Sequence, residues 1–299
     1  MKIALYGNNE AGHRKEDLDA LLATLDAKGF SWQVNREFAA KITAITGREI
    51  PSTSTFTSAA DMDAGTELMV CYGGDGTFLA GVKLLDTKPV PMAGINSGRL
   101  GFLTNITKEE MDGAFDLLKA GQYRIVERPL LEVSGDLSTA GGDAAGFPYA
   151  FNEFSVQRYG ASMISTEVYV DSEMIATYWG DGVLISTPAG STAYSLSVGG
   201  PVVAPECNCF VISPIAPHNL SMRPVVIPDD STVMLRTNAR DGRFRVSLDN
   251  RIRPAADGMR FSVKKAKKTV FLVQFQNISF YDTLRNKMMW GIDRRDRSK

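Results

Sequence analysis

The sequence lacks an excess of either charge, because 33 lysines and arginines are balanced by 34 aspartates and glutamates. This balance argues against a general binder of nucleic acid. Cysteine is scarce: Cys71, Cys207 and Cys209 form no Cys-X-X-Cys pair, which favours a reducing cytoplasm. No apolar run approaches the roughly 18 residues that a membrane-spanning helix needs, so we expect no membrane partner. The start of the chain turns polar after one short apolar stretch, unlike a signal peptide.

Two common nucleotide motifs are also missing. There is no Gly-X4-Gly-Lys-Ser/Thr segment, which excludes a P-loop NTPase, and no strand of the first third precedes Gly-X-Gly-X-X-Gly. The latter absence argues against a standard dehydrogenase. The composition, with 44% hydrophobic and 22% charged residues, is ordinary for a soluble globular protein, and a length of 299 residues predicts about two domains.

Residues 1–122 are expected to form an α/β, Rossmann-like domain with a parallel sheet. Short apolar strands alternate there with helical patterns, the arrangement typical of such sheets. The helical patterns include Leu18, Leu21, Leu22 and Leu25 at helical spacing and a second stretch over residues 34–46. We expect the tail, 276–299, to pack back on this domain as a surface element or frayed end.

Residues 123–275 are expected to form a mainly antiparallel, all-β domain. The predicted strands are rich in β-branched residues or alternate in polarity. They cover residues 123–133, 150–158, 163–170, 182–186, 232–237, 243–248 and 259–275. The Gly-rich stretch 134–148 is interpreted as a hairpin loop, and the lysines of 264–268 as a solvated hairpin.

The most informative short segment is Gly73-Gly74-Asp75-Gly76-Thr77, which follows a strand and opens a helix. Its glycines allow backbone N–H groups to approach a phosphate, and the helix start favours an anion. A carboxylate at this point repels phosphate, but it suits a residue that accepts a proton from an attacking hydroxyl. The alternative, about equally favoured by the local sequence, is a plain strand-to-helix turn with Asp75 or Thr77 as N-cap.

A second glycine-rich block covers residues 180–197 and is crowded with small and hydroxylated side chains. A flat ligand could lie beside them, with Tyr194 able to stack on it. The alternative is a close-packed helix start. Asn152 and Glu153 form a polar pair in an apolar strand and could bind a ribose diol. From the pair alone, an edge strand that faces water is the favoured interpretation.

Together these segments resemble the NAD kinase family. The matching segments are 73–77, 94–103, Asn152-Glu153, 187–194 and 213–224, in the family order. The first alone is moderately specific, because lipid and sphingoid kinases carry a similar loop. The block Thr-Pro-Ala-Gly-Ser-Thr-Ala-Tyr, combined with the Asn-Glu pair, is much more specific.

The resemblance implies a kinase that transfers the terminal phosphoryl group of ATP to the adenosine-ribose 2′-hydroxyl of NAD, giving NADP. Asp75 would be the catalytic proton acceptor. It further implies NAD contacts from a set of residues spread over both domains: Asp75, Gly76, Asn152, Glu153, Asp181, Ala189, Thr192, Ala193, Tyr194, Ser195, Leu196 and Ser197. A homodimer or homotetramer is implied as well, with Asp181 reaching an amide or amine of the nucleotide, if need be from a neighbouring subunit.

The chain departs from the family pattern at two places. Ala80 stands where many members carry a basic residue, and Asp249-Asn250-Arg251 stands where many have Asp-Gly-Gln. Donor phosphates would therefore be bound by Gly73, Gly74 and Thr77 with a cation from Arg99, Arg223 or Arg251. No dedicated metal cage is visible in the sequence, so Mg²⁺ or another divalent cation is expected to arrive mainly on the donor's phosphates.

Two other functions compete with this one. A lipid or sugar kinase could share the 73–77 loop, but the pair at 152–153 and the block at 187–194 count against it. A non-catalytic NAD sensor would bind NAD without turnover, and the carboxylate of Asp75 argues against that.

Overall fold

The computed structural model describes residues 1–7, 12–86, 88–98, 101–139, 146–276 and 278–290. The chain forms two compact units: Met1–Glu127 with Val270–Lys299, and Arg128–Thr269. The first is α/β with parallel strands and the second is mainly antiparallel β, so the predicted fold class is confirmed.

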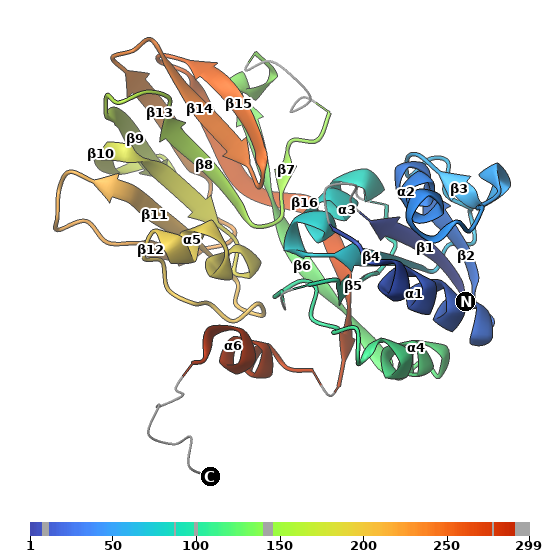
Figure 1. Cartoon of the computed structure of the whole chain (residues 1–299). Helices are drawn as coiled ribbons and strands as arrows, with labels where there is room; N and C mark the ends of the chain where they lie inside the picture. The colour runs from blue at the N-terminus through green and yellow to red at the C-terminus, as the bar shows by residue number, and fades with distance from the viewer. Residues whose placement is uncertain (8–11, 87, 99–100, 140–145, 277, 291–299) are drawn as a thin grey trace. The chain divides into compact units, whose positions relative to one another are not determined.

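The first unit is built on a parallel sheet with the order β5-β4-β1-β2-β3 (Figure 1). Its strands are β1 (Lys2–Gly7), β2 (Ser31–Asn35), β3 (Thr55–Phe56), β4 (Leu68–Gly73) and β5 (Met92–Asn96). The end of β16 joins it, where Leu272 pairs with Met92. The helices are α1 (Lys15–Ala27), α2 (Arg36–Thr46), α3 (Asp75–Leu85), α4 (Met111–Lys119) and α6 (Phe280–Met288), with a 3₁₀ turn, η1, at Ser52–Ser54.

Helices cover both faces of this sheet. The four leucines predicted to share a helix face are buried on α1, in one core with the inward residues of α2, α4 and the sheet. Helix α3 packs on the opposite face, where a Cβ on Gly81 would lie 2.7 Å from Cys71 Sγ. Covering on both faces explains why β1, β4 and β5 are largely apolar, as the sequence indicated.

The helical pattern expected over residues 34–46 was wrong at its start. Residues Ser31–Asn35 form strand β2, and the helix begins at Arg36. Asn35 caps that helix, because its side-chain oxygen accepts from the N–H groups of Glu37 and Phe38 at 3.1 and 3.4 Å. Helix α4 was not predicted at all.

The second unit is built from antiparallel strands. They are β7 (Tyr149–Ala150), β8 (Glu153–Arg158), β9 (Ile164–Val170), β10 (Glu173–Ser186), β11 (Cys209–Pro217), β12 (Val225–Pro228), β13 (Val233–Ala239), β14 (Arg243–Leu248) and β15 (Arg251–Ala256). Strands β6 (Tyr123–Gly135) and β16 (Arg260–Phe275) run through both units. The short helices are η2 (Asp136–Ser138), η4 (Ala189–Thr192) and α5 (Tyr194–Ser197).

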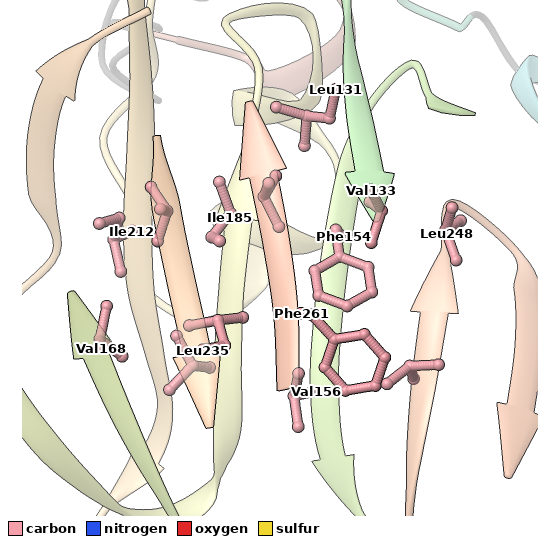
Figure 2. Packing of buried hydrophobic residues seen from close by; sticks show 14 of the residues in the cluster. Leu131, Val133, Phe154, Val156, Val168, Ile185, Ile212, Leu235, Leu248 and Phe261 are labelled. Carbon is pink, nitrogen blue, oxygen red and sulfur yellow. The ribbon is translucent and has the colours of Figure 1, made fainter. Parts of the chain in front are cut away.

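The long strand β10 changes partners along its length. Its first half pairs with β9, and its second half pairs with β8 and β11. Outward from β8 come β14 and β15, and outward from β9 come β13 and β16. The inward side chains of these strands meet in one apolar core (Figure 2), where the rings of Phe154 and Phe261 lie 5.6 Å apart.

Three expectations for this unit need correction. The lysines of 264–268 lie inside the single strand β16 instead of a hairpin, and Lys265 pairs with Asp229 at 2.6 Å. Strands β11, β12 and β15 were not predicted. Of the expected loop 134–148, residues 140–145 lie outside the described residues, and the start of the loop belongs to β6 and η2.

Candidate functional site

In the first unit, the site is the turn between β4 and α3. Gly74 is the N-cap, and Cβ atoms added to Gly74 or Gly76 would meet nothing within 4 Å. A Cβ on Gly73 would lie 2.3 Å from Thr77 Oγ1, so glycine lets the buried Thr77 fold back onto the turn. The open side therefore presents the first N–H groups of α3, which a helix leaves without an internal acceptor.

The carboxylate of Asp75 does not cap its own helix, so the N-cap interpretation was wrong. Oδ1 accepts from the N–H groups of Leu103 and Thr104 at 3.0 and 3.1 Å and from Thr104 Oγ1 at 3.2 Å. Oδ2 accepts from the Phe102 N–H at 3.0 Å. Four donors of one short segment therefore fix the orientation of a side chain that is still 31% exposed.

Two glycines allow the segment of residues 101–104 to lie this close. A Cβ on Gly101 would lie 2.0 Å from Asp75 Oδ1, and a Cβ on Gly94 would lie 2.5 Å from the backbone oxygen of Leu103. Asn96 at the end of β5 completes the arrangement, because its Nδ2 donates to Thr104 Oγ1 at 3.1 Å. The contacts between β5, residues 101–104 and the Asp75 carboxylate therefore require glycine, which has no Cβ, at positions 94 and 101.

A lysine from the far end of the chain also faces Asp75. Lys287 of α6 places Nζ 3.4 Å from Asp75 Oδ2, and the same Nζ lies 4.4 Å from the centre of the Phe102 ring. Sequence reasoning missed this residue, because 212 positions separate it from Asp75.

In the second unit, Asn152 directly precedes β8 and Glu153 is its first residue. Strand β8 lies between β10 and β14. Both side chains are only 7% exposed, so the interpretation as an edge-strand pair that faces water was wrong. Among the residues that the structure describes, Asn152 Oδ1 and Glu153 Oε2 are buried without a hydrogen-bond partner. Buried oxygens in that state are suited to a ligand with hydroxyl donors.

Asp249 supports this pair from the turn after β14. Its carboxylate accepts from the backbone N–H groups of Phe151, Asn152 and Glu153 at 3.0, 2.7 and 3.2 Å. The backbone N–H of Asp249 donates to the backbone oxygen of Glu153 at 2.9 Å. The sequence indicated Asp249 only as part of the segment 249–251 that departs from the family pattern, and it did not indicate these partners.

Burial raises the pKa of both carboxyl groups. Burial, with the nearby Asp249 second, raises the pKa of Glu153 to about 8, and an N–H bond from Tyr194 opposes the rise. Burial also raises the pKa of Asp249, against its three backbone donors and Arg251. At neutral pH Glu153 therefore carries a proton and can both donate and accept a hydrogen bond.

The glycine-rich block lies against the same pair. Thr187 Oγ1 donates to the backbone oxygen of Phe151 at 2.7 Å, and a Cβ on Gly190 would lie 2.1 Å from the backbone oxygen of Asn152. Beyond it, Ala189 and Thr192 lie in η4, Tyr194, Leu196 and Ser197 in α5, and Ala193 between them. Ser195 is fully buried, and its Oγ has no partner among the described residues.

The remaining predicted site residues are engaged within the second unit. Asp181 pairs with Arg158 at 3.0 Å. Arg251 donates to the backbone oxygens of Phe147 and Tyr149, and Arg223 donates to those of Leu220 and Met222. Arg99 lies outside the described residues.

Two other features are absent from the part of the chain that the structure describes. No group of three or more histidine, cysteine, aspartate or glutamate side chains there is placed to hold a metal ion. No helix there is both long and apolar enough to span a membrane.

Comparison with known proteins matches both units to family models. The ATP-NAD kinase N-terminal domain matches residues 18–123, and the ATP-NAD kinase C-terminal domain matches residues 152–275. The NAD kinase of Flavobacterium psychrophilum is 37% identical over 298 residues, covering 99% of this chain and 100% of the relative. That of Bacteroides fragilis (strain ATCC 25285) is 35% identical over 296 residues, with 99% and 100% coverage.

Solved structures share the fold. Yeast NADH kinase complexed with NADH superposes with a TM-score of 0.85 at 21% identity, covering 98% of this chain and 88% of the other. An NAD kinase from Archaeoglobus fulgidus in complex with ATP gives 0.70 at 22% identity, with 97% and 99% coverage.

Proposed function

Because the chain belongs to the NAD kinase family, it is an enzyme that phosphorylates NAD with ATP, and we propose that Asp75 is its proton acceptor. The observation that carries this proposal is the orientation of the Asp75 carboxylate. Three donors bond to Oδ1, whereas one backbone N–H and Lys287 face Oδ2, so Oδ2 is the oxygen open to a substrate hydroxyl. The comparisons do not support a lipid kinase, a sugar kinase or a non-catalytic sensor.

The proposed step is transfer to the 2′-hydroxyl of the adenosine ribose. The hydroxyl oxygen forms a bond to the γ-phosphorus of ATP as the bond from phosphorus to the β-γ bridging oxygen breaks and ADP leaves with the electron pair. The hydroxyl proton passes to Asp75 Oδ2. A carboxylate can serve as the acceptor because the hydroxyl loses its proton late in a loose transition state.

On the second unit, we propose that Asn152 and Glu153 bind ribose hydroxyls. The buried, unpartnered Asn152 Oδ1 and Glu153 Oε2 support this role. The proposed adenine-side contacts are Ala189, Thr192, Ala193, Tyr194, Ser195, Leu196 and Ser197, and Asp181 is proposed to recognise an amide or amine. Gly76 is proposed to lie along the pyrophosphate.

For the donor, we propose that the open N–H groups at Gly74 and the start of α3 attract phosphate oxygens, with Gly73 and Thr77 shaping the turn. The residues present fit a divalent cation that ATP carries, since kinases typically hold Mg²⁺ by phosphates and one or two carboxylates. Asp75 is the carboxylate next to that turn, and the cation would supply neutralisation of charge on the transferring group.

We further propose a cytoplasmic homo-oligomer. The free thiols of Cys71, Cys207 and Cys209 suit a reducing compartment. Large apolar side chains are exposed on the second unit, including Met174, Ile175, Trp179 and Val226, and such side chains suit a subunit interface. Light scattering during gel filtration tests the oligomeric state.

The decisive variant for the reaction is Asp75→Asn. It keeps the shape of the side chain and removes the proton acceptor, so we expect kcat to fall about 10²–10⁴-fold. NAD binding by calorimetry should survive, because the proposed ribose contacts of Asn152 and Glu153 and the proposed adenine-side contacts remain. Formation of NADP from NAD, ATP and Mg²⁺ is the measurement, and near wild-type turnover would remove the role of Asp75.

A further inference from the structure

The reaction centre needs a cation that the sequence alone did not identify. Charge on the transferring phosphoryl group is ordinarily offset by lysine, arginine or a metal ion. The helix after the phosphate turn offers none at position 80, where this chain has alanine. Arg223 and Arg251 lie in the second unit and donate to backbone oxygens there.

Lys287 is in the same unit as Asp75 and faces it directly. Its Nζ is 3.4 Å from Oδ2, the carboxylate oxygen that carries fewer donors, and its side chain is 32% exposed. A hydroxyl that gives its proton to Oδ2 must lie within about 2.6–3.2 Å of that oxygen. The reacting oxygen and the ammonium group therefore have Oδ2 as a common neighbour.

The position of Lys287 is tied to the segment that orients Asp75. Phe102 donates its N–H to Oδ2, and its ring lies beneath Nζ at 4.4 Å. The same ring packs against Phe280, the first residue of α6, with centroids 6.2 Å apart. Thr283 and Leu284 of that helix are buried. One aromatic residue thus contacts the helix, its lysine and the carboxylate.

We propose that Lys287 is the basic residue of the phosphoryl-transfer centre. It pairs with Asp75 in the free protein and donates to oxygens of the transferring phosphoryl group when NAD and ATP are bound. An ammonium group has three N–H donors, so it can bond to both groups. This inference rests on the proposed role of Asp75 as proton acceptor.

In the proposed step, Lys287 keeps its proton. The hydroxyl oxygen bonds to the γ-phosphorus, the hydroxyl proton moves to Asp75, and ADP takes the electrons of the breaking bond. The ammonium group offsets negative charge on the non-bridging oxygens, which matters most in the transition state. Its loss should therefore lower kcat and leave the KM for NAD little changed.

The test uses the full-length protein with NAD, ATP and Mg²⁺. Lys287→Met should lower kcat about 10²–10³-fold, as removal of one preorganised donor does elsewhere. Lys287→Arg should keep more activity than Lys287→Met, and added ethylammonium should restore part of the activity of Lys287→Ala. Arg285→Met is the matched control, because it removes a cation from the same helix, where Arg285 pairs with Asp282.

Thermal denaturation and NAD binding of each variant separate loss of folding from loss of chemistry. If Lys287→Met kept the kcat of Arg285→Met, or if ethylammonium failed to restore Lys287→Ala, the role of Lys287 would be wrong. Asp75→Asn is assayed in parallel. If that variant kept its turnover, the proposed role of Asp75 would fall, and with it the inference about Lys287.

Discussion

The two units hold their carboxylates in opposite ways. Asp75 is about one third exposed, pairs with a lysine and begins a helix. Glu153 and Asp249 are buried, and burial raises the pKa of both carboxyl groups. Backbone N–H groups orient a carboxylate in each unit, and a cation lies near each: Lys287 Nζ is 3.4 Å from Asp75 Oδ2, and Arg251 is 4.0 Å from Asp249 Oδ2.

One residue type thus supports two tasks in this protein. A carboxylate that accepts a proton has to be within reach of the substrate hydroxyl, and the partly exposed side chain of Asp75 suits that task. A carboxyl group that binds a sugar works by its hydrogen bonds and needs no charge.

The largest effect is expected for Asp249→Ala. The substitution leaves the N–H groups of Phe151, Asn152 and Glu153 buried without their acceptor, which should cost on the order of 3–5 kcal/mol of unfolding free energy. Urea denaturation measures this loss. Asp230→Ala, at an exposed position, is the control and should be nearly neutral; equal losses in the two variants would contradict the supporting role of Asp249.

A pH dependence is expected from Glu153. Its pKa is about 8 in the folded protein against 4.5 in the unfolded chain. Below pH 4.5 both states are protonated; between the two values only the unfolded chain loses the proton, so stability falls as pH rises and the loss is complete above about 8. At about 1.4 kcal/mol per pH unit, the wild type loses about 3–4 kcal/mol between pH 5 and 8.

Glu153→Gln should remove this component, because the amide has no proton to lose. The variant should gain stability relative to the wild type as pH rises, measured as the difference in melting temperature from pH 5 to 8. Glu173→Gln, on the exposed start of β10, should follow the wild-type curve. A difference between Glu153→Gln and wild type that does not change with pH would refute the burial argument.

The smallest effect is expected for Gly101→Ala in the first unit. The added methyl group would lie 2.0 Å from Asp75 Oδ1, so the segment must move and the carboxylate must turn. A displacement of about 1 Å can cost about 10²-fold in rate, and we expect kcat to fall by up to that factor. Gly98→Ala, where a Cβ meets nothing within 4 Å, should leave kcat unchanged; similar kcat values for the two variants would argue that the segment does not orient Asp75.

Local patterns predicted much of the fold. The leucines of α1 repeat at helical spacing, and β1 and β4 are apolar runs that end in glycine. Strand β2 was missed because Ser31, Gln33 and Asn35 make it polar, and its burial comes from a neighbouring strand. The lysines in β16 suggested a turn, but strand pairing and the ion pair of Lys265 override that local preference.

The site was predicted where its chemistry is local, as in the turn around Asp75. Contacts between distant residues were not predicted. Asp249 reaches Asn152 across 97 positions and Lys287 reaches Asp75 across 212, and no spacing rule in one sequence indicates such pairs. The burial of Glu153 follows from β14 and β10 on either side, which the pair itself does not reveal.

The first unit is discontinuous, since Val270–Lys299 returns to it after the whole second unit. During synthesis on a ribosome, the strand that borders β5 and the helix that brings an ammonium group to Asp75 therefore emerge after the whole second unit. A nascent chain can complete the second unit well before the first. A message cut short just after the second unit would yield a polypeptide with its phosphate turn intact and no α6 beside it.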